Sequence, residues 1–388
     1  MIYLDNAATT PIDPIVLDAM MPYFKENFGN PGSLHKLGRD AKEAVENARV
    51  QVAKLINARP EQIIFTSGAT EANNTVVEMI RKYLQNTPKK HILVSAIEHK
   101  SVLNPVSSLT ELGFDVSYLN ATPYEMLRQK ELNQGLRDDT GFVSMMYINN
   151  ETGFTHDVHM VGKACSDRGI LFHTDCVQAA GCVPIDVEQI GCDFATLSSH
   201  KIHGPKGVGA LYIRDKSLFE PMIRGGSSQE FGMRGGTENV AGIVGFGKAC
   251  ELAKSGLSVL SIAHTETLKR EFFGSLQGAL SNLGLPGYVK LNTMFRIGAK
   301  ILSICVKGVD AESLVLLMES AGVCISAGSA CNSNESVPSH VLKASGLTDE
   351  EARSTVRLSV SRMNTPSEMK TAATKMAECI KSLVFFNG

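Results

Sequence analysis

Two short apolar runs enclose the segment Thr196-Leu197-Ser198-Ser199-His200-Lys201-Ile202-His203-Gly204-Pro205-Lys206-Gly207. The runs, at 193–197 and 208–213, are each typical of a buried strand. Open α/β sheets bind their ligands just beyond the carboxyl ends of strands. A partly desolvated amine at such a place, here that of Lys201, can act as a nucleophile or form a Schiff base. A solvated lysine in a Gly/Pro turn is the alternative, and this segment alone does not exclude it.

Strands and helices alternate over most of the chain before this segment. Helical periodicity predicts a long amphipathic helix over about 34–55 and further helices over 70–84, 96–112 and 158–168. Short apolar runs predict strands at 62–66, 91–95, 114–118, 142–148, 170–174 and 194–198. This β-α-β alternation predicts an α/β fold with a mostly parallel sheet covered by helices on both faces.

The pattern changes after about residue 255. A long helix is predicted over 263–283, a strand over 301–306, a helix over 310–321 and a strand over 355–360. Two capping boxes, starting at Thr348 and Thr365, enclose the last strand. We therefore expect a large α/β domain over 15–255 and a smaller α+β domain formed by 1–14 and 256–388.

Composition excludes several classes of protein. The 388 residues are 43% hydrophobic and 20% charged, with a formal net charge of -2, so no overall field attracts nucleic acid or an anionic membrane. No apolar run is long enough to span a bilayer, and the N-terminus does not have the pattern of a signal peptide. The nine cysteines, without a Cys-x-x-Cys pair, indicate reduced thiols in a cytoplasmic protein without a zinc site.

Two further strand ends carry groups suited to a phosphorylated cofactor. The segment Thr66-Ser67-Gly68-Ala69-Thr70-Glu71-Ala72-Asn73 joins a strand to a helix, and its small residues and free helix amides predict a phosphate cradle. Asp175 directly follows a strand, where an acid can pair with the ring nitrogen of pyridoxal phosphate. An ordinary capped turn and an N-cap aspartate are the alternatives.

Three more residues stand out by their surroundings. His99 follows the strand at 91–95, where an imidazole can stack on a flat ring or move protons, although a lone histidine is more often structural. Cys331 lies among small polar residues, unlike most other cysteines of the chain, and is a candidate nucleophile or a bystander thiol. Arg357 interrupts an apolar strand, where a guanidinium suits a carboxylate ligand or a structural ion pair.

Taken together, these features resemble the pyridoxal-phosphate-dependent cysteine desulfurases of the NifS/IscS type, in the class V aminotransferase group of fold-type I enzymes. The resemblance runs nearly end to end. It rests on Tyr3-Leu4-Asp5-Asn6-Ala7-Ala8-Thr9-Thr10, Gly29-Asn30-Pro31, Gly68-Ala69-Thr70-Glu71-Ala72-Asn73, Glu98-His99, Asn149-Asn150-Glu151-Thr152-Gly153, His173-Thr174-Asp175, Ser198-Ser199-His200-Lys201, Arg234-Gly235-Gly236-Thr237, Gly328-Ser329-Ala330-Cys331 and Arg357-Leu358-Ser359.

The resemblance implies a seven-stranded sheet in the large domain and a role for each matched residue. Lys201 is the lysine that binds the cofactor covalently. Asp175 pairs with the ring nitrogen, Gln178 contacts the ring hydroxyl and His99 stacks on the ring. The phosphate group is bound by the cradle at Ala69 and Thr70, by Ser198 and His200, and by Thr237 from the other subunit of a homodimer; Asn150 and Arg357 hold the substrate carboxylate.

The implied reaction removes sulfur from L-cysteine. The Cys331 thiolate takes the sulfur as a persulfide, L-alanine is released, and the persulfide passes to an acceptor protein. Iron–sulfur cluster assembly, tRNA thiolation and DNA phosphorothioation are the pathways such an acceptor can serve. An aminotransferase, a selenocysteine lyase, a catalytically silent scaffold and a hydrolase that pairs Cys331 with a histidine are the competing interpretations.

Four positions depart from the family pattern. Cys176 stands under the cofactor ring, where the family usually has alanine. A second thiol there can form side adducts with the cofactor, but we expect it to fill space as a small hydrophobic group. Ser227 and Ser228 stand in a stretch where the family is richer in glycine, and Gly235 replaces a common serine. The departures at Ser227, Ser228 and Gly235 concern the phosphate loop and not the reaction.

Overall fold

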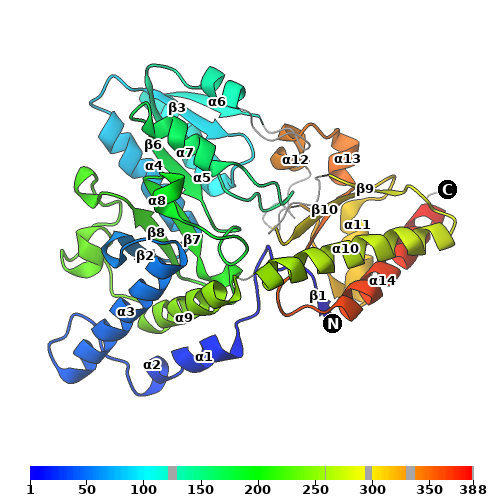
Figure 1. The fold of residues 1–388 in the computed structure, drawn as a ribbon, viewed down its shortest axis with the longest axis horizontal. Coiled ribbons are helices and arrows are strands. Elements are labelled where there is room, and N and C mark those ends of the chain that lie inside the picture. The colour runs from blue at the N-terminus through cyan, green and yellow to red at the C-terminus, as the bar shows by residue number, and fades with distance from the viewer. Residues whose placement is uncertain (121–128, 258, 293–298, 329–336, 387–388) are drawn as a thin grey trace.

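The larger part of the molecule is built on a seven-stranded sheet, shown on the left of Figure 1. The computed structural model describes residues 1–120, 129–257, 259–292, 299–328 and 337–386. The strand order is β2-β8-β7-β6-β5-β3-β4, and every neighbouring pair is parallel except the two that β8 makes. The strands are β2 (Ile63–Thr66), β3 (His91–Ser95), β4 (Asp115–Leu119), β5 (Thr140–Ser144), β6 (Leu171–Asp175), β7 (Phe194–Ser198) and β8 (Gly209–Ile213).

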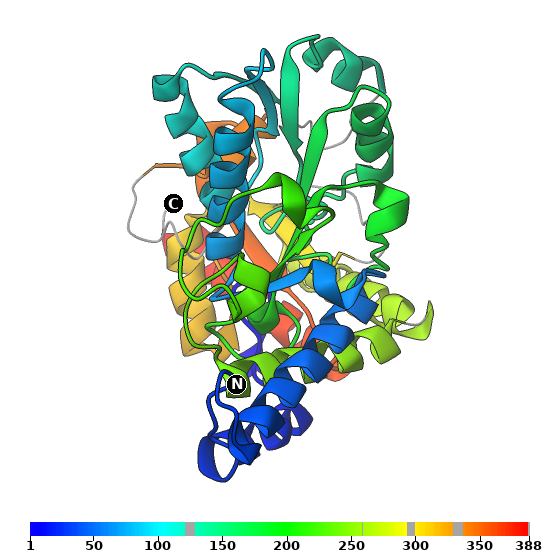
Figure 2. The same cartoon turned by 90° about the vertical axis from the view of Figure 1, so that its left-hand side faces the viewer.

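Helices cover both faces of this sheet, as the side view in Figure 2 shows. Successive residues of a strand point to opposite faces: Ile63 and Phe65 of β2 join one buried cluster, and Ile64 joins the other. The predicted mostly parallel sheet with helices on both faces is therefore confirmed. The first cluster includes residues of α1 (Pro14–Met20), α3 (Lys36–Leu55), α7 (Val158–Ser166), α8 (Val187–Ile190) and α9 (Val240–Gly256), and the second includes α4 (Ala69–Leu84) and α5 (Lys100–Ser108).

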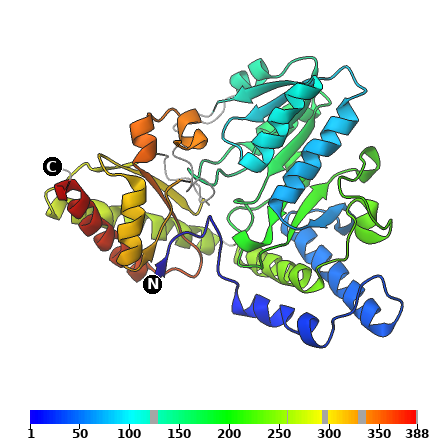
Figure 3. The same ribbon diagram turned by 180° about the vertical axis from the view of Figure 1, so that it is seen from behind.

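A separate buried cluster of apolar residues lies in the smaller part of the molecule, on the left of Figure 3. An antiparallel sheet of order β12-β10-β9 is packed there against helices. Its elements are β9 (Val289–Leu291), β10 (Ile301–Val306), β12 (Thr355–Ser359), α10 (Val259–Asn282), α11 (Ala311–Ser320), α12 (His340–Ala344), α13 (Asp349–Arg353) and α14 (Pro366–Phe386).

The N-terminal segment joins the two parts. β1 (Ile2–Tyr3) pairs in parallel with β11 (Val323–Cys324), and Asp5 bridges to Ser359 of β12. The chain then crosses to the larger part, where the main-chain N–H of Thr10 donates to the carbonyl of His200 over 3.0 Å. The division into domains at 14/15 and 255/256 stays a prediction.

One predicted strand is shorter than expected. The apolar run at 142–148 predicts a strand to Ile148, but β5 ends at Ser144. Beyond it the N–H of Tyr147 still donates to the carbonyl of Asp175 over 2.9 Å, while Ile148 pairs with Thr155 across a turn. The turn takes Asn150 and its neighbours to the edge of the sheet. Within the described ranges, no helix combines the length and apolarity that a membrane span requires.

Candidate active site

The carboxyl ends of the parallel strands surround a cavity of about 420 Å³. It lies between the larger sheet, the N-terminal segment and β12, where the parallel-sheet rule predicts a ligand site. Of the predicted site residues that the structure describes, all except Thr237 line it, namely Ala69, Thr70, His99, Asn150, Asp175, Gln178, Ser198, His200, Lys201 and Arg357. Residues from widely separated parts of the sequence are thus brought together in one place.

The predicted cradle is a tight turn between β2 and α4. Gly68 is the N-cap of α4 with a φ of 156°, a backbone conformation that favours glycine. Strand β8 approaches the same turn closely, since a Cβ on Gly209 would lie 2.9 Å from the Cα of Gly68. The first amides of α4, at Ala69 and Thr70, have no acceptor within the helix and lie beside the cavity. This turn can bind an anionic oxygen through backbone N–H groups.

Lys201 ends the short 3₁₀ helix η3 (Ser199–Lys201), which directly follows β7. Its Nζ donates to the main-chain carbonyls of Ala7 and Ala8 over 2.7 and 2.6 Å. The carbonyl of Lys201 itself accepts from the buried ammonium of Lys300 over 2.9 Å. The N-terminal segment and the loop before β10 therefore both help to place this lysine at the cavity.

Asp175, at the end of β6, is buried with 5% of its surface exposed. Its Oδ1 accepts from the main-chain N–H of Val177 over 2.9 Å, and its Oδ2 accepts from Asn73 Nδ2 over 3.0 Å. These two hydrogen bonds hold the carboxylate in one orientation. Gln178, three residues after Asp175, donates from Nε2 to the carbonyl of Ala7 over 3.0 Å, so it is held by the N-terminal segment.

Two histidines beside the cavity favour the neutral form. Burial is the main cause that lowers the pKa of His99, the charge of Lys201 adds to it, and the Asp175 carboxylate opposes it. Burial also lowers the pKa of His200 to about 4, helped by Lys201 and two further lysines. The His200 Nδ1 lies 3.1 Å from Thr9 Oγ1. Near neutral pH both rings therefore offer one N–H donor and one bare nitrogen.

Arg357, in the middle of β12, makes one of its two predicted contacts, the structural ion pair. Its Nη2 pairs with Asp5 Oδ1 over 2.8 Å, and its Nη1 donates to the carbonyl of Asn150 over 2.9 Å. The predicted alternative of a structural ion pair is thus present. The side chain also lines the cavity, and its Nε has no acceptor among the described residues.

The loop that carries Thr237 is attached to the larger sheet at two points. Thr237 is exposed and does not line the cavity of its own chain. Arg234, three residues earlier, makes a two-point ion pair with Glu71 in the first turn of α4, at 2.9 and 3.2 Å. Glu230 is buried and pairs with Arg49 of α3 over 2.8 Å.

Cys331 lies outside the described residues, but its described neighbours on both sides contact the site. Ser326 pairs with Arg357 through two main-chain hydrogen bonds of 3.1 and 2.7 Å. On the other side, Ser339 Oγ donates to Glu151 Oε2 over 2.5 Å, and His340 Nε2 lies 3.0 Å from the carbonyl of Glu98.

Comparison with known proteins agrees with this geometry. The family model "Aminotransferase class-V" matches residues 2–371. The chain belongs to the class-V aminotransferase family. It is similar to the cysteine desulfurase IscS of Methanosarcina thermophila, with 39% identity over 98% of this chain and 92% of that protein. The cysteine desulfurase IscS of Neisseria meningitidis serogroup C (strain 053442) is 40% identical over 99% of this chain and 92% of that protein.

Comparison with solved structures also finds proteins of this type. A NifS-like protein superposes with a TM-score of 0.87 and 34% identity, over 97% of this chain and 98% of that chain. The structure titled "SspA in complex with cysteine" superposes with a TM-score of 0.78 and 32% identity, over 93% of this chain and 99% of that chain. The predicted family and fold class are confirmed.

The cavity of this member of the class-V family fits pyridoxal phosphate. Among the described residues, three polar atoms of cavity-lining side chains are buried without a partner: Asn150 Oδ1, Gln178 Oε1 and Arg357 Nε. Buried polar atoms are rarely left unpaired, so they indicate a polar ligand. The cradle amides suit a phosphate group, and the buried carboxylate of Asp175 suits a protonated ring nitrogen.

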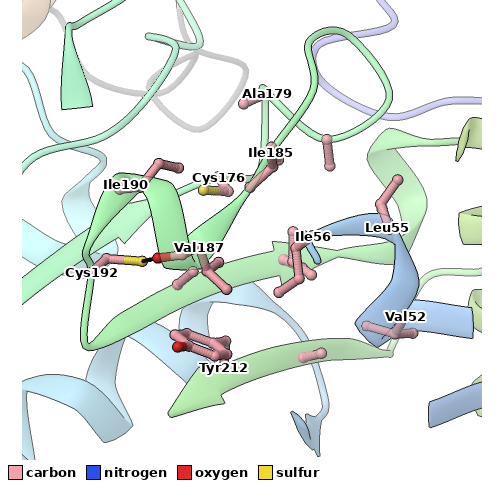
Figure 4. Packing of buried hydrophobic residues seen from close by; sticks show 14 of the residues in the cluster. Val52, Leu55, Ile56, Cys176, Ala179, Ile185, Val187, Ile190, Cys192 and Tyr212 are labelled. Atoms are coloured by element: carbon pink, nitrogen blue, oxygen red, sulfur yellow. Dashed lines mark hydrogen bonds between the residues drawn. The ribbon is translucent and has the colours of Figure 1, made fainter. Parts of the chain in front are cut away.

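The thiol of Cys176 is turned away from this cavity. It is fully buried in the core cluster beneath the sheet, near Ala179, Ile185 and Val187 (Figure 4), and does not line the cavity. Burial raises the pKa of its thiol well above the usual value, which suppresses the reactive thiolate. The expectation that Cys176 acts as a small hydrophobic group in this family member is confirmed.

Several residues at the site escaped prediction from the sequence. Ala7 and Ala8 contact Lys201 through main-chain carbonyls, which no side-chain pattern reveals. Asp5 was part of the matched N-terminal motif, but its pairing with Arg357 joins strands far apart in the sequence. Asn73 follows Ala69 by one helical turn, and this spacing is the signal that could have placed its side chain beside the cradle.

A buried histidine on β6 predicts a loss of stability in acid. Burial lowers the pKa of His173 to about 4, and its ring contacts Ser144 Oγ and Thr196 Oγ1 at 2.8 and 3.1 Å. The unfolded chain keeps the usual pKa near 6.5. Between pH 6.5 and about 4 only the unfolded chain binds this proton. The contribution of His173 to the free energy of unfolding is therefore fully present above pH 6.5. It falls by about 1.4 kcal/mol for each pH unit below that value.

Urea unfolding at several pH values measures this slope. The variant His173→Asn keeps a polar group near Ser144. It is expected to reduce the slope of the free energy of unfolding against pH by the amount that corresponds to about one proton. The variant His159→Asn, at an exposed position of α7, serves as the control and is expected to leave the slope unchanged. An unchanged slope in His173→Asn contradicts the prediction.

Proposed function

We propose that this protein is a pyridoxal-phosphate-dependent cysteine desulfurase that converts L-cysteine to L-alanine and transfers the sulfur, as a persulfide on Cys331, to an acceptor protein. The observation that carries the proposal is the meeting of Lys201, Asp175 and the α4 cradle in one cavity. Membership of the class-V family and similarity to proteins named cysteine desulfurase support the reaction. A related structure titled as a complex with cysteine supports the substrate.

The residues that would hold the cofactor all line the cavity, and the family resemblance implies the role of each. The amides of Ala69 and Thr70 would bind the phosphate, with Ser198 and His200. Asp175 would face the ring nitrogen, Gln178 would face the ring hydroxyl, and His99 would lie against the ring. Lys201 would form the covalent link. When bound, pyridoxal phosphate supplies the electron sink for the bonds that break at the substrate.

The chain's own groups would bind the substrate and move its protons. Arg357 and Asn150 would hold the substrate carboxylate, since Arg357 keeps a buried Nε without a described partner at the cavity. The Lys201 amine would remove the α-proton and return a proton to the product. Its contacts with the carbonyls of Ala7 and Ala8 would keep Nζ directed at the same place during both transfers.

Cys331 would receive the sulfur. Its thiolate would attack the substrate sulfur, so that a new S–S bond forms as the substrate C–S bond breaks. Two contacts of described residues support this role: Ser326 pairs with Arg357, which lines the cavity, and Ser339 donates to Glu151, which directly follows the cavity-lining Asn150. Transfer to an acceptor protein would then need this segment to reach the surface.

The test is alanine formation from L-cysteine in the presence of a reductant. We expect the parent protein to form alanine, and Cys331→Ser to lose this activity while keeping its yellow cofactor, because serine cannot form a persulfide. The matched control is Cys379→Ser, a half-buried thiol on α14, which is expected to keep full activity. Full activity in Cys331→Ser would show that the thiol is a bystander and that a lyase or aminotransferase reaction is the better assignment.

We also propose a cytoplasmic homodimer in which Thr237 of each chain completes the phosphate site of the other. The exposure of Thr237, which does not line the cavity of its own chain, supports this arrangement. Sedimentation of the holoenzyme at the mass of a single chain contradicts it. The net charge of -2 supports a protein acceptor over direct contact with nucleic acid.

A further inference from the structure

A buried asparagine of α4 lies between two groups of the proposed site. Asn73 is fully buried, and its Nδ2 donates to Asp175 Oδ2 over 3.0 Å and to Ser101 Oγ over 2.8 Å. A carboxylate only accepts hydrogen bonds, so the amide nitrogen and not the amide oxygen faces Asp175. Both hydrogens of the amide are thereby used, one on each neighbour.

The hydroxyl of Ser101 continues the chain to His99. Ser101 Oγ lies 2.7 Å from His99 Nδ1, and the main-chain N–H of Ser101 donates to the same nitrogen over 3.1 Å. A main-chain N–H cannot accept a hydrogen bond, so Nδ1 must be the bare nitrogen of the ring. Because Ser101 Oγ already accepts from Asn73, its own hydrogen is available for Nδ1.

We infer that Asn73 and Ser101 are positioning residues of the active site: they hold His99 as the tautomer protonated on Nε2 and join it to the carboxylate of Asp175 in one hydrogen-bonded unit. The inference rests on the proposed function for the roles of His99 and Asp175. The hydrogen bonds themselves do not depend on that function.

The position of His99 at the start of a helix is a second reason why Nδ1 carries no proton. Its side chain is the N-cap of α5, so the ring also satisfies the start of a helix. A proton on Nδ1 would place two N–H groups against each other and would break this cap. His99 therefore presents an N–H to its surroundings through Nε2, and forming the imidazolium would require the loss of the cap.

The three segments involved come from different elements. Asn73 lies on α4, Ser101 on α5 and Asp175 at the end of β6. The neighbouring residue Asn74 makes a useful contrast, since its amide donates to the main-chain carbonyls of Thr70 and Ser101 over 2.8 and 3.3 Å. It touches neither the Ser101 hydroxyl nor Asp175, so it matches Asn73 in type and helix but not in role.

The test measures the tautomer of His99 directly. In holoenzyme labelled with ¹⁵N-histidine, the two ring nitrogens of His99 are identified as the signals lost in His99→Gln. We expect the parent to show a bare Nδ1 and a protonated Nε2. Ser101→Ala removes one donor to Nδ1 and is expected to change the tautomer ratio about fivefold, the worth of one hydrogen bond. Ser101→Thr keeps the hydroxyl and is expected to restore the parent signals.

Kinetics provide the second measurement. Asn73→Leu is expected to lower kcat for alanine formation about tenfold with little change in KM. The substitution would misplace the reacting groups but would remove no contact with the substrate. Asn74→Leu is the control, with kcat expected within about twofold of the parent, since its hydrogen bonds reach only main-chain carbonyls.

The outcomes separate this inference from the proposed function. A parent protein that forms no alanine overturns the proposed function, while the tautomer measurement still tests the hydrogen-bond chain. Signals of His99 that stay the same in Ser101→Ala overturn the inference, as does a parent in which Nδ1 carries the proton. If Asn73→Leu does not fold, the comparison of Ser101→Ala with Ser101→Thr still decides.

Discussion

Replacing Lys201 with alanine is expected to abolish alanine formation, with kcat lowered by at least about 10³-fold. The same side chain would form the covalent link to the cofactor and would move the α-proton, and general acid–base catalysis alone contributes about 10²–10⁴-fold. The visible absorbance of the bound cofactor is expected to change as well, because the Schiff base with the protein is lost. Product analysis and absorption spectra of the purified variant measure both effects.

Two controls separate the chemistry of the amine from its charge. Lys201→Arg keeps a cation that can donate to the carbonyls of Ala7 and Ala8, but arginine stays protonated. We expect this variant to be as inactive as Lys201→Ala. Partial recovery of Lys201→Ala by added methylamine would support proton transfer by the amine. More than a tenth of the parent activity in either variant would contradict the role of Lys201.

The second large effect is on stability. Replacing Glu230 with alanine is expected to lower the free energy of unfolding by about 3–5 kcal/mol, because Arg49 would stay buried without its main partner. Glu230 receives two hydrogen bonds from Arg49, of 2.8 and 2.9 Å, and a third of 2.6 Å from the main-chain N–H of Phe65. The exposed partner Glu46 alone cannot replace these contacts.

The backbone conformation at this point depends on the same ion pair. Glu230 and Phe231 are consecutive non-glycine residues with φ of 43° and 57°, in the left-handed region. Such residues cost of order 1–3 kcal/mol each and persist only where surrounding contacts hold them. The Phe231 ring lies 4.9 Å from the Arg49 guanidinium, so Arg49 holds both residues. The same loop carries Arg234 and Thr237, and we therefore expect weaker retention of the cofactor in this variant.

Urea unfolding of the variant and its controls measures the effect. The double variant Arg49→Met/Glu230→Met removes both charges and is expected to recover most of the stability, since no unpaired charge is buried. Glu61→Ala disrupts the exposed pair of Arg59 and Glu61, whose side chains are 63% and 56% exposed, and is expected to leave the free energy of unfolding almost unchanged. A single variant Glu230→Ala as stable as Glu61→Ala would contradict the prediction.

The placement of candidate site residues at strand ends was predictable because it depends on neighbouring residues in the sequence. Each candidate group follows an apolar strand by a few residues, as Asp175 and Lys201 do, and parallel strands bring their carboxyl ends to one edge. Alternation of strands and helices was enough to predict the parallel sheet. The end of β5 was not predicted, because the apolar run at 142–148 continues after the chain has left β3.

The sequence by itself determined the sheet with its helical covers, the cradle, and the set of residue types that meet at the strand ends. These properties depend on periodicity and on the order of short motifs along the chain. Only the tertiary structure decided which carbonyls accept hydrogen bonds from the Lys201 amine and that Asp5 pairs with Arg357. It also decided that Asn73 connects Asp175 to Ser101. These contacts join main-chain atoms or distant segments, so their partners depend on how the chain packs in three dimensions and leave no local pattern.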